Sequence, residues 1–320
     1  MMVALSGCQL RPQPVATPTA PGPSPALPTY TPPPVTPRVV LVAPAEAEAT
    51  LAQQVEAALQ VLASTARMEF SRQAALPEDE ANAIALLVAL PPDPGLQAWA
   101  QAHPDVQAAG IGMPGLQAAA NLSVIAPEGL RYDQLGFALG YLAALTTPEY
   151  RIGALARDAS PQSLSLVRGF VAGGTYYCGL CRPLHPPYLG YPALLDIVPD
   201  DPVAAGVSTL LLFPTPATAA EAGFHTSTGF ALVGVGEPSA EVAPLWLASA
   251  DFDVEGTLTF LWEQTLAGNG GGMWPLGIRV HTLDGARVSA GRLALVEALI
   301  TELVAGRVDT GVDPATGQPR

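Results

Sequence analysis

The sequence predicts an α/β fold built on mostly parallel sheets. Short apolar runs of strand length alternate with segments that carry apolar residues at helical spacing. The clearest unit spans residues 133–173, where a helix over 134–145, a strand over 152–156 and a second helix follow one another closely. Ser160 and Pro161 are the N-cap and first-turn signals of that second helix, and Gly173 with Gly174 predicts its end.

The remaining elements follow the same alternation along the chain. Apolar runs predict strands at 39–42, 84–90, 106–112, 122–125, 207–213, 230–235, 246–250 and 277–281. Helical spacing predicts helices over 51–62, 96–102, 217–222, 255–266 and from Ser289 to Gly306, and a flexible turn is expected at 269–272. This order indicates parallel sheets with helices on both faces.

Length, net charge and the pattern of charged residues exclude several classes of function. The 320 residues are enough for two domains with cores of their own. A formal net charge of −14, with only 14 Lys and Arg, argues against a nucleic-acid partner and against an electrostatic hold on anionic membranes. The uncharged, apolar window 202–220 is interrupted by Pro214 and Pro216, so no transmembrane helix is predicted.

The first 37 residues read as an anchor and a tether. Residues 5–8, LSGC, fit a lipobox, which predicts lipid on Cys8 within a residual signal peptide over 1–8; the rival interpretation is a chance match, and the seven residues before Cys8 include no basic one. Residues 9–37 form a proline-rich segment, with eleven prolines between 11 and 37. Such a segment is a semi-rigid spacer, although a ligand for proline-binding modules is the alternative.

Several motifs in this order resemble one family. They are the lipobox, GFALGYLAAL (136–145), RIGALARD (151–158), VRGFVAGG (167–174), and LASADFDVEGTLTFLWEQTLAGN followed by WPLGIRVH (247–281). Together they are similar to the basic membrane protein family of ABC-transporter substrate-binding lipoproteins. The resemblance implies the type I periplasmic-binding-protein fold, with two Rossmann-like lobes joined by a multi-strand hinge. The lobes expected are 38–148 plus about 248–280, and 149–247 plus about 281–310.

The same resemblance implies a function. It suggests a lipid-anchored extracytoplasmic monomer that captures a nucleoside-like or other small polar solute between its lobes and delivers it to an ABC permease and ATPase. No cofactor, metal or catalysis is expected. Where the family carries an Asp that holds ribose hydroxyls, this chain has Gly236, so we expect weak affinity for ribose-bearing ligands. The alternatives are a sensor or assembly ectodomain without transport and, third, a hydrolase on the same scaffold.

Chemical motifs are few. Cys178 and Cys181 form a CxxC after a helix rather than at a helix N-terminus, which favours a local disulfide over a redox or zinc site. The four histidines lack metal-binding spacing, and there is neither a GxSxG elbow nor a phosphate-binding loop. The sequence therefore predicts no catalytic residue and no metal site.

Candidate ligand contacts follow from the fold, because ligands bind at the carboxyl ends of parallel strands. The positions predicted at those ends are Glu46, Met113, Arg157, Asp158, Ser160, Thr215 and Glu237. The polar ones offer directional hydrogen bonds and Met113 an apolar wall. The rival interpretation is that Arg157 and Asp158 pair on the surface while Ser160 only caps its helix.

Overall fold

A computed structural model describes residues 36–78, 83–156, 158–179, 190–195, 206–213 and 230–320. Residues 36–320 form one compact unit, separate from residues 1–35. The predicted lipobox with Cys8, nearly all of the predicted tether, Cys181, Arg157, Thr215 and the helix predicted at 217–222 lie outside the described residues.

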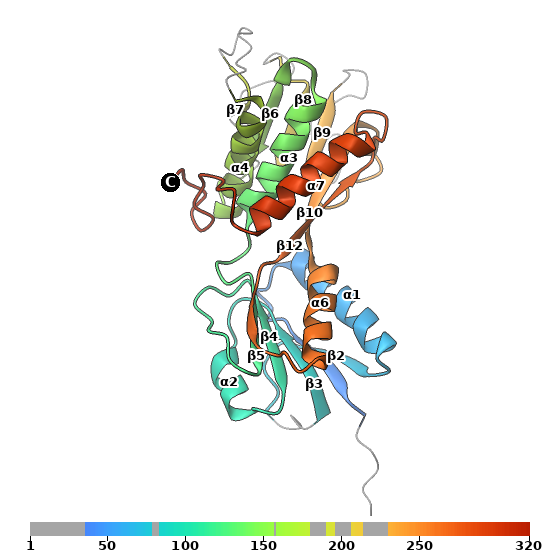
Figure 1. Ribbon diagram of the computed structural model, residues 1–320, viewed down its shortest axis with the longest axis vertical. Coiled ribbons are helices and arrows are strands. Elements are labelled where there is room, and N and C mark those ends of the chain that lie inside the picture. Colours follow the sequence, from blue (N-terminus) through green and yellow to red (C-terminus); the bar gives the residue numbers. More distant parts are fainter. Residues whose placement is uncertain (1–35, 79–82, 157, 180–189, 196–205, 214–229) are drawn as a thin grey trace, which may run out of the picture. The chain divides into compact units, whose positions relative to one another are not determined.

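The first sheet has six strands, and every pair of neighbours in it is parallel (Figure 1). Its order is β11 (Gly272–Trp274), β5 (Leu122–Ile125), β4 (Gln107–Ile111), β3 (Ile84–Ala89), β1 (Arg38–Val42) and β2 (Glu69–Gln73). Helix α1 (Ala49–Thr65) contacts β1 and β2, and α2 (Leu96–Ala102) contacts β4. Helix α6 (Val254–Leu266) lies beside α1.

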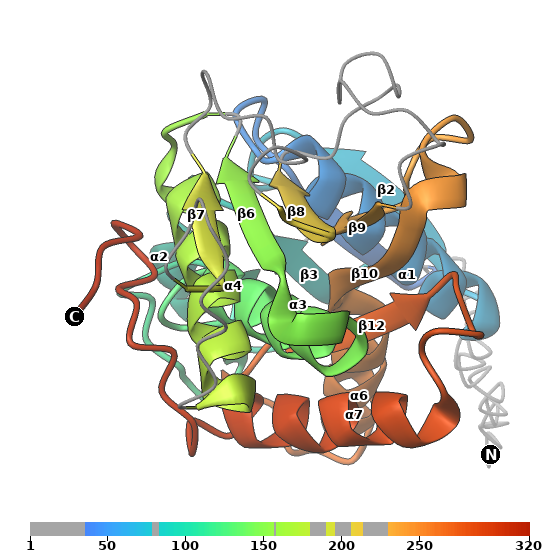
Figure 2. The same cartoon turned by 90° about the horizontal axis from the view of Figure 1, so that it is seen from above.

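The second sheet also has six strands, of which only the last is antiparallel to its neighbour. Its order is β12 (Gly277–Thr282), β10 (Trp246–Asp253), β9 (Ala231–Val235), β8 (Thr209–Phe213), β6 (Ile152–Ala156) and β7 (Ala193–Leu195). Helices α3 (Tyr132–Thr146), α4 (Pro161–Cys178) and α7 (Ala290–Val304) gather on one side of it, as Figure 2 shows.

Both faces of each sheet are buried, which is why its strands read as continuous apolar runs. In β1, Val39 and Leu41 belong to one hydrophobic cluster while Val40 and Val42 belong to another on the opposite face. In the second sheet, Leu211 packs on the side of the α3 and α4 helices, and the alternate residues Leu210 and Leu212 pack in a third cluster. The predicted mostly parallel α/β architecture is confirmed.

Helices α3 and α4 are in direct backbone contact through glycines. A Cβ added at Gly136 or Gly140 would overlap the carbonyl oxygens of Leu166 and Phe170 in α4. A Cβ at Gly173 would likewise overlap the carbonyl of Phe137 in α3. Absence of a side chain is what allows the two helices to approach this closely.

This contact corrects the predicted end of α4. The helix does not stop at Gly173 and Gly174 but continues to Cys178, and Gly179, at φ +61°, takes the C-cap position. The two glycines serve interhelical packing rather than termination. Three short strands, β2, β7 and β11, were also not predicted, and β11 begins within the turn expected at 269–272.

The chain passes between the sheets three times, after β5, after β10 and between β11 and β12. Helix α3 packs on α4 and α7, and strands β10 and β12 belong to the second sheet. The expected division placed α3 and most of β10 and β12 in the first lobe instead. The strands β10 and β12 pair antiparallel with Asp251 opposite Arg279, which holds both in one sheet. The lobe boundaries themselves stay a prediction.

Among the described helices, none is both long enough and apolar enough to cross a bilayer.

Candidate ligand-binding pocket

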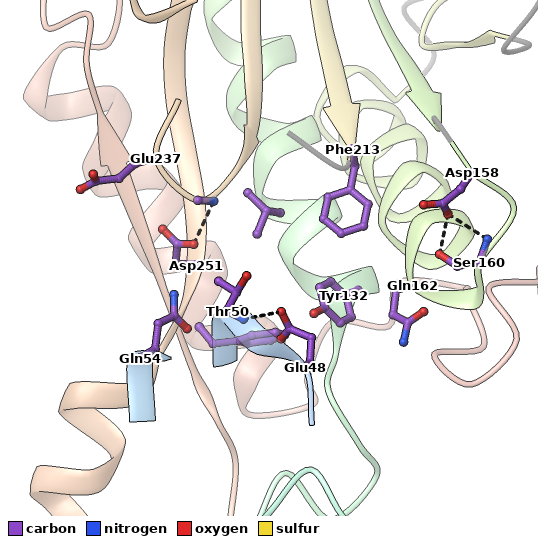
Figure 3. A pocket seen from close by; sticks show the side chains of 13 residues that line it. Glu48, Thr50, Gln54, Tyr132, Asp158, Ser160, Gln162, Phe213, Glu237 and Asp251 are labelled. Atoms are coloured by element: carbon purple, nitrogen blue, oxygen red, sulfur yellow. Dashed lines mark hydrogen bonds between the residues drawn. The ribbon is translucent and has the colours of Figure 1, made fainter. Parts of the chain in front are cut away.

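A pocket of about 570 Å³ lies at the carboxyl ends of strands from the second sheet and the start of α1 (Figure 3). This volume is in the range of sites for small organic ligands. Its lining combines carboxylates, amides and aromatic rings. The described lining residues are Glu48, Thr50, Gln54, Tyr132, Asp158, Ser160, Gln162, Phe213, Val235, Gly236, Glu237, Asp251 and Phe252.

Three aromatic side chains form the apolar part of the lining. The ring of Tyr132, the first residue of α3, lies 5.8 Å from that of Phe213 and 5.4 Å from that of Phe252, centroid to centroid. Phe213 ends β8, so its position follows from the strand register. Burial, and then the charge of Glu48, raise the pKa of Tyr132, which keeps its hydroxyl protonated.

Two of the four lining carboxylates are already hydrogen-bonded to helix ends. Glu48 caps α1 and accepts from the Thr50 and Leu51 amides at 3.0 and 3.1 Å. Asp158 accepts from the Ser160 amide at 2.9 Å, from the Ser160 hydroxyl at 2.6 Å and from the Ser163 hydroxyl. Both carboxylates therefore stabilise the start of a helix.

Asp251 is different, because it is buried and holds a single hydrogen bond from the described residues, whereas Glu48 and Asp158 are exposed. The side chain is 9% exposed, and Oδ1 accepts from the Gly236 amide at 3.0 Å. Oδ2 accepts no hydrogen bond from any residue that the structure describes. Burial, the largest influence, raises the pKa of this carboxyl. Figure 3 shows Asp251 on the side of the pocket opposite Asp158 and Ser160, with Tyr132 and Phe213 between them.

The backbone at Gly236 holds Asp251 in place. Gly236 has a φ of +79°, a conformation that favours glycine over aspartate. Its carbonyl accepts from the Ser249 hydroxyl at 2.6 Å, and Ser249 in turn accepts from the Trp246 indole at 2.8 Å. Strands β9 and β10 are thus tied together at the pocket edge.

The raised pKa of Asp251 gives a testable pH dependence. The folded protein binds this proton more tightly than the unfolded chain, so the group's contribution to stability falls as pH rises from its unfolded pKa of 3.8 through its folded pKa. We expect Asp251→Asn, which keeps the Oδ1 acceptor, to be at least as stable as the parent at neutral pH. Urea unfolding between about pH 4 and 7 checks this.

Asp158→Asn is the matched control with the opposite sign. Hydrogen bonds from Ser160 and Ser163 lower the pKa of Asp158, so its contribution is present above pH 3.8 and is lost as pH falls through the folded pKa. The variant should lose stability at neutral pH. Equal loss in both variants would contradict the assignment for Asp251.

The structure brings three of the predicted contacts to the pocket and leaves two elsewhere. Asp158, Ser160 and Glu237 line it. Glu46 lies exposed on the loop after β1, and Glu48, two residues on, takes the place at the pocket. Met113 is 3% exposed in a hydrophobic cluster beside Leu96 and Leu116, because its side chain fills the space over Gly110. Ligand contact by these residues stays a prediction.

The sequence analysis did not predict Phe213 and Asp251, which give the pocket an aromatic ring and a buried carboxylate. Phe213 lies two residues before the predicted position Thr215, and the strand-end rule could have included it. Asp251 lies level with Gly236 because β10 pairs in parallel with β9, Ala250 opposite Val235. That register is a long-range property, and the strand was predicted to end at Ala250.

Cys178 is buried at the end of α4. Its predicted disulfide with Cys181 involves a residue outside the described part of the chain and stays a prediction. Within the described residues, no group of three or more His, Cys, Asp or Glu side chains could hold a metal ion.

Comparison with known proteins rests on structure alone. No family model matches the chain, and no curated protein matches it. The fold matches an ABC transporter solute-binding protein from Conexibacter woesei with a TM-score of 0.61 and 17% identity, over 85% of this chain and 98% of that one. A second ABC transporter solute-binding protein, from Aeropyrum pernix, matches with a TM-score of 0.53 and 15% identity, over 85% and 92%.

A third solved structure, a transcriptional activator of the comK gene from Bacillus halodurans, matches with a TM-score of 0.53 and 13% identity, over 85% of this chain and 99% of that one. At these identities the likeness concerns the fold. The chain has the type I periplasmic-binding-protein fold, with two mostly parallel six-stranded sheets flanked by helices.

Proposed function

We propose that this chain is a solute-binding protein that captures one small polar molecule in the 570 Å³ pocket and presents it to an ABC importer. The observation that carries the proposal is the set of uncommitted polar groups around an aromatic wall. Tyr132, Gln54, Gln162, Glu237 and Oδ2 of Asp251 form no side-chain hydrogen bond with any described residue. Such groups become satisfied when a ligand supplies the partner.

The lining contains two kinds of polar residue, and this difference supports the same proposal. Glu48, Asp158 and Ser160 shape the pocket through helix caps, while the uncommitted groups face the space left for a ligand. Two of the structural matches are ABC transporter solute-binding proteins, which agrees with a transport role. The third match is a transcriptional activator, and it is the reason to retain a sensor without transport as the second candidate.

Finer features of the proposal come from the sequence. We propose lipid attachment at Cys8 and the proline-rich segment 9–37 as the tether, which together would place a monomer outside the cell next to a permease and its ATPase. Affinity for ribose-bearing ligands is expected to be weak, because Gly236 lacks the acceptor of the resembled family.

Release of the bound molecule tests the function. The full chain, purified natively and then denatured, should release a small molecule that mass spectrometry detects and calorimetry shows to rebind. Phe213→Ala should weaken that rebinding by roughly 10-fold or more, because an aromatic wall of the pocket is lost.

Phe260→Ala is the control, since Phe260 is an exposed phenylalanine on α6 and does not line the pocket. It should leave the affinity unchanged. Equal losses in the two variants would place the site elsewhere. Absence of any released or rebinding molecule would favour the sensor candidate over transport.

A further inference from the structure

The charged side chains in the described lining of the pocket have one sign. Its described lining holds four carboxylates, Glu48, Asp158, Glu237 and Asp251, and no Lys, Arg or His. The whole chain carries a net charge of −14, which adds a field of the same sign. Glu48 accepts two hydrogen bonds and Asp158 three at the starts of helices, so among the described residues Asp251 and Glu237 are the lining carboxylates with the fewest partners.

No side chain that the structure describes forms an ion pair with Asp251. The charged and titratable groups near it are Arg279 and His281 on β12 and Glu237 after β9. Arg279 stands opposite Asp251 in the strand pairing, but its guanidinium lies 3.7 Å from Glu255 and 4.0 Å from Asp253 instead. A carboxylate that is nine-tenths buried with one free oxygen is costly unless a cation reaches it.

The aromatic rings favour the same kind of partner. Tyr132, Phe213 and Phe252 present π surfaces in the same pocket as Asp251. Aromatic faces attract ammonium groups and also cover the apolar body of an amine. Gln54, which lies beneath Asp251 in Figure 3, has an amide oxygen free to accept from an ammonium group.

We infer that the solute is an organic cation, a primary amine or amidine, whose charged group pairs with Asp251 and whose body lies against Tyr132 and Phe213. This inference rests on the proposed function and names its substrate class. The ammonium donates to Oδ2 of Asp251, with Glu237 as a second, exposed carboxylate. Binding would remove the unbalanced buried charge, which gives the site its preference over neutral molecules.

Matched probes separate charge from shape. Tryptamine and tryptophol, phenethylamine and phenylethanol, and putrescine and butanediol each pair an amine with an alcohol of the same body. Adenosine and phenylacetate represent neutral ribosides and anions. Calorimetry on the full chain should show at least one amine binding roughly 30-fold or more tightly than its alcohol.

Two variants assign the effect to Asp251. Asp251→Asn keeps the acceptor for the Gly236 amide and should remove most of the amine preference, because it weakens the amines far more than the alcohols. Glu297→Gln, an exposed carboxylate on α7 outside the pocket, should keep the preference. Loss of the preference in both variants would overturn the assignment.

The outcomes distinguish the inference from the proposed function. If adenosine, phenylacetate or the alcohols bind as tightly as the amines or more tightly, the cationic class is wrong while solute capture stands. If none of the probes binds and natively purified protein releases no small molecule, both are overturned.

Discussion

Gly140→Ala should destabilise the protein by a net of about 2 to 3 kcal/mol. Alanine raises helix propensity by about 1 kcal/mol, but the added methyl would overlap the carbonyl and Cα of Phe170 in α4. Those atoms are backbone and cannot rotate away, so α3 and α4 must separate. The midpoint of urea unfolding, followed by circular dichroism, measures the loss.

Gly291→Ala is the matched control. Gly291 is in the first turns of α7, and a Cβ there would meet no atom within 4 Å. Its replacement should leave stability unchanged or raise it slightly. If Gly140→Ala proves equally harmless, the α3–α4 contact is looser than the structure has it.

Asp133→Ala should cost about 3 to 5 kcal/mol, because the largely buried Arg131 guanidinium loses its buried partner and keeps only Glu128, whose side chain is 71% exposed. Asp133 is fully buried at the start of α3 and accepts from Arg131 Nε at 2.8 Å and Nη2 at 2.7 Å. It also accepts from the Thr310 hydroxyl at 2.5 Å, which ties the segment after α7 to α3. The side chain of Arg131 is 21% exposed, so little water replaces these bonds. Chemical unfolding of the variant measures the loss.

The comparison for Asp133 is another Asp–Arg pair in the same region. Asp309 lies 3.5 Å from Arg320, with the two side chains 66% and 46% exposed. Asp309→Ala should therefore cost less than about 1 kcal/mol. Similar losses for the two substitutions would show that burial does not set the strength of the Asp133 network.

The sequence predicted helix ends well where they depend only on the residues next to them. The caps at Ser160 and Ser289, and the positive φ of Gly306 after α7, follow from side-chain and backbone preferences over a few residues. β2 was missed because Glu69–Gln73 is an edge strand with polar, partly exposed residues and no apolar run. Gly173 was misinterpreted because its role depends on contact with Phe137 in α3, which is far away in the sequence.

The pocket was harder to predict for a similar reason. The strand-end rule found Asp158 and Glu237, which lie two residues after the ends of β6 and β9. Asp251 lies inside β10, and only its pairing with β9 brings it to the pocket. Burial and the number of hydrogen bonds that a carboxylate accepts also depend on folded geometry, and they separate the buried Asp251 from the exposed Asp158.

The bond between Thr310 and Asp133 has a consequence for synthesis on the ribosome. The two residues are 177 positions apart in the chain. At ordinary elongation rates, roughly 10 to 35 s separate the appearance of the carboxylate from that of its hydroxyl partner. During that interval α3 lacks part of its surroundings, since α7 and the strands β10 and β12 are also made late. The second sheet and its helices should therefore complete folding only after residue 310 leaves the exit tunnel, and proteolysis of stalled nascent chains can show it.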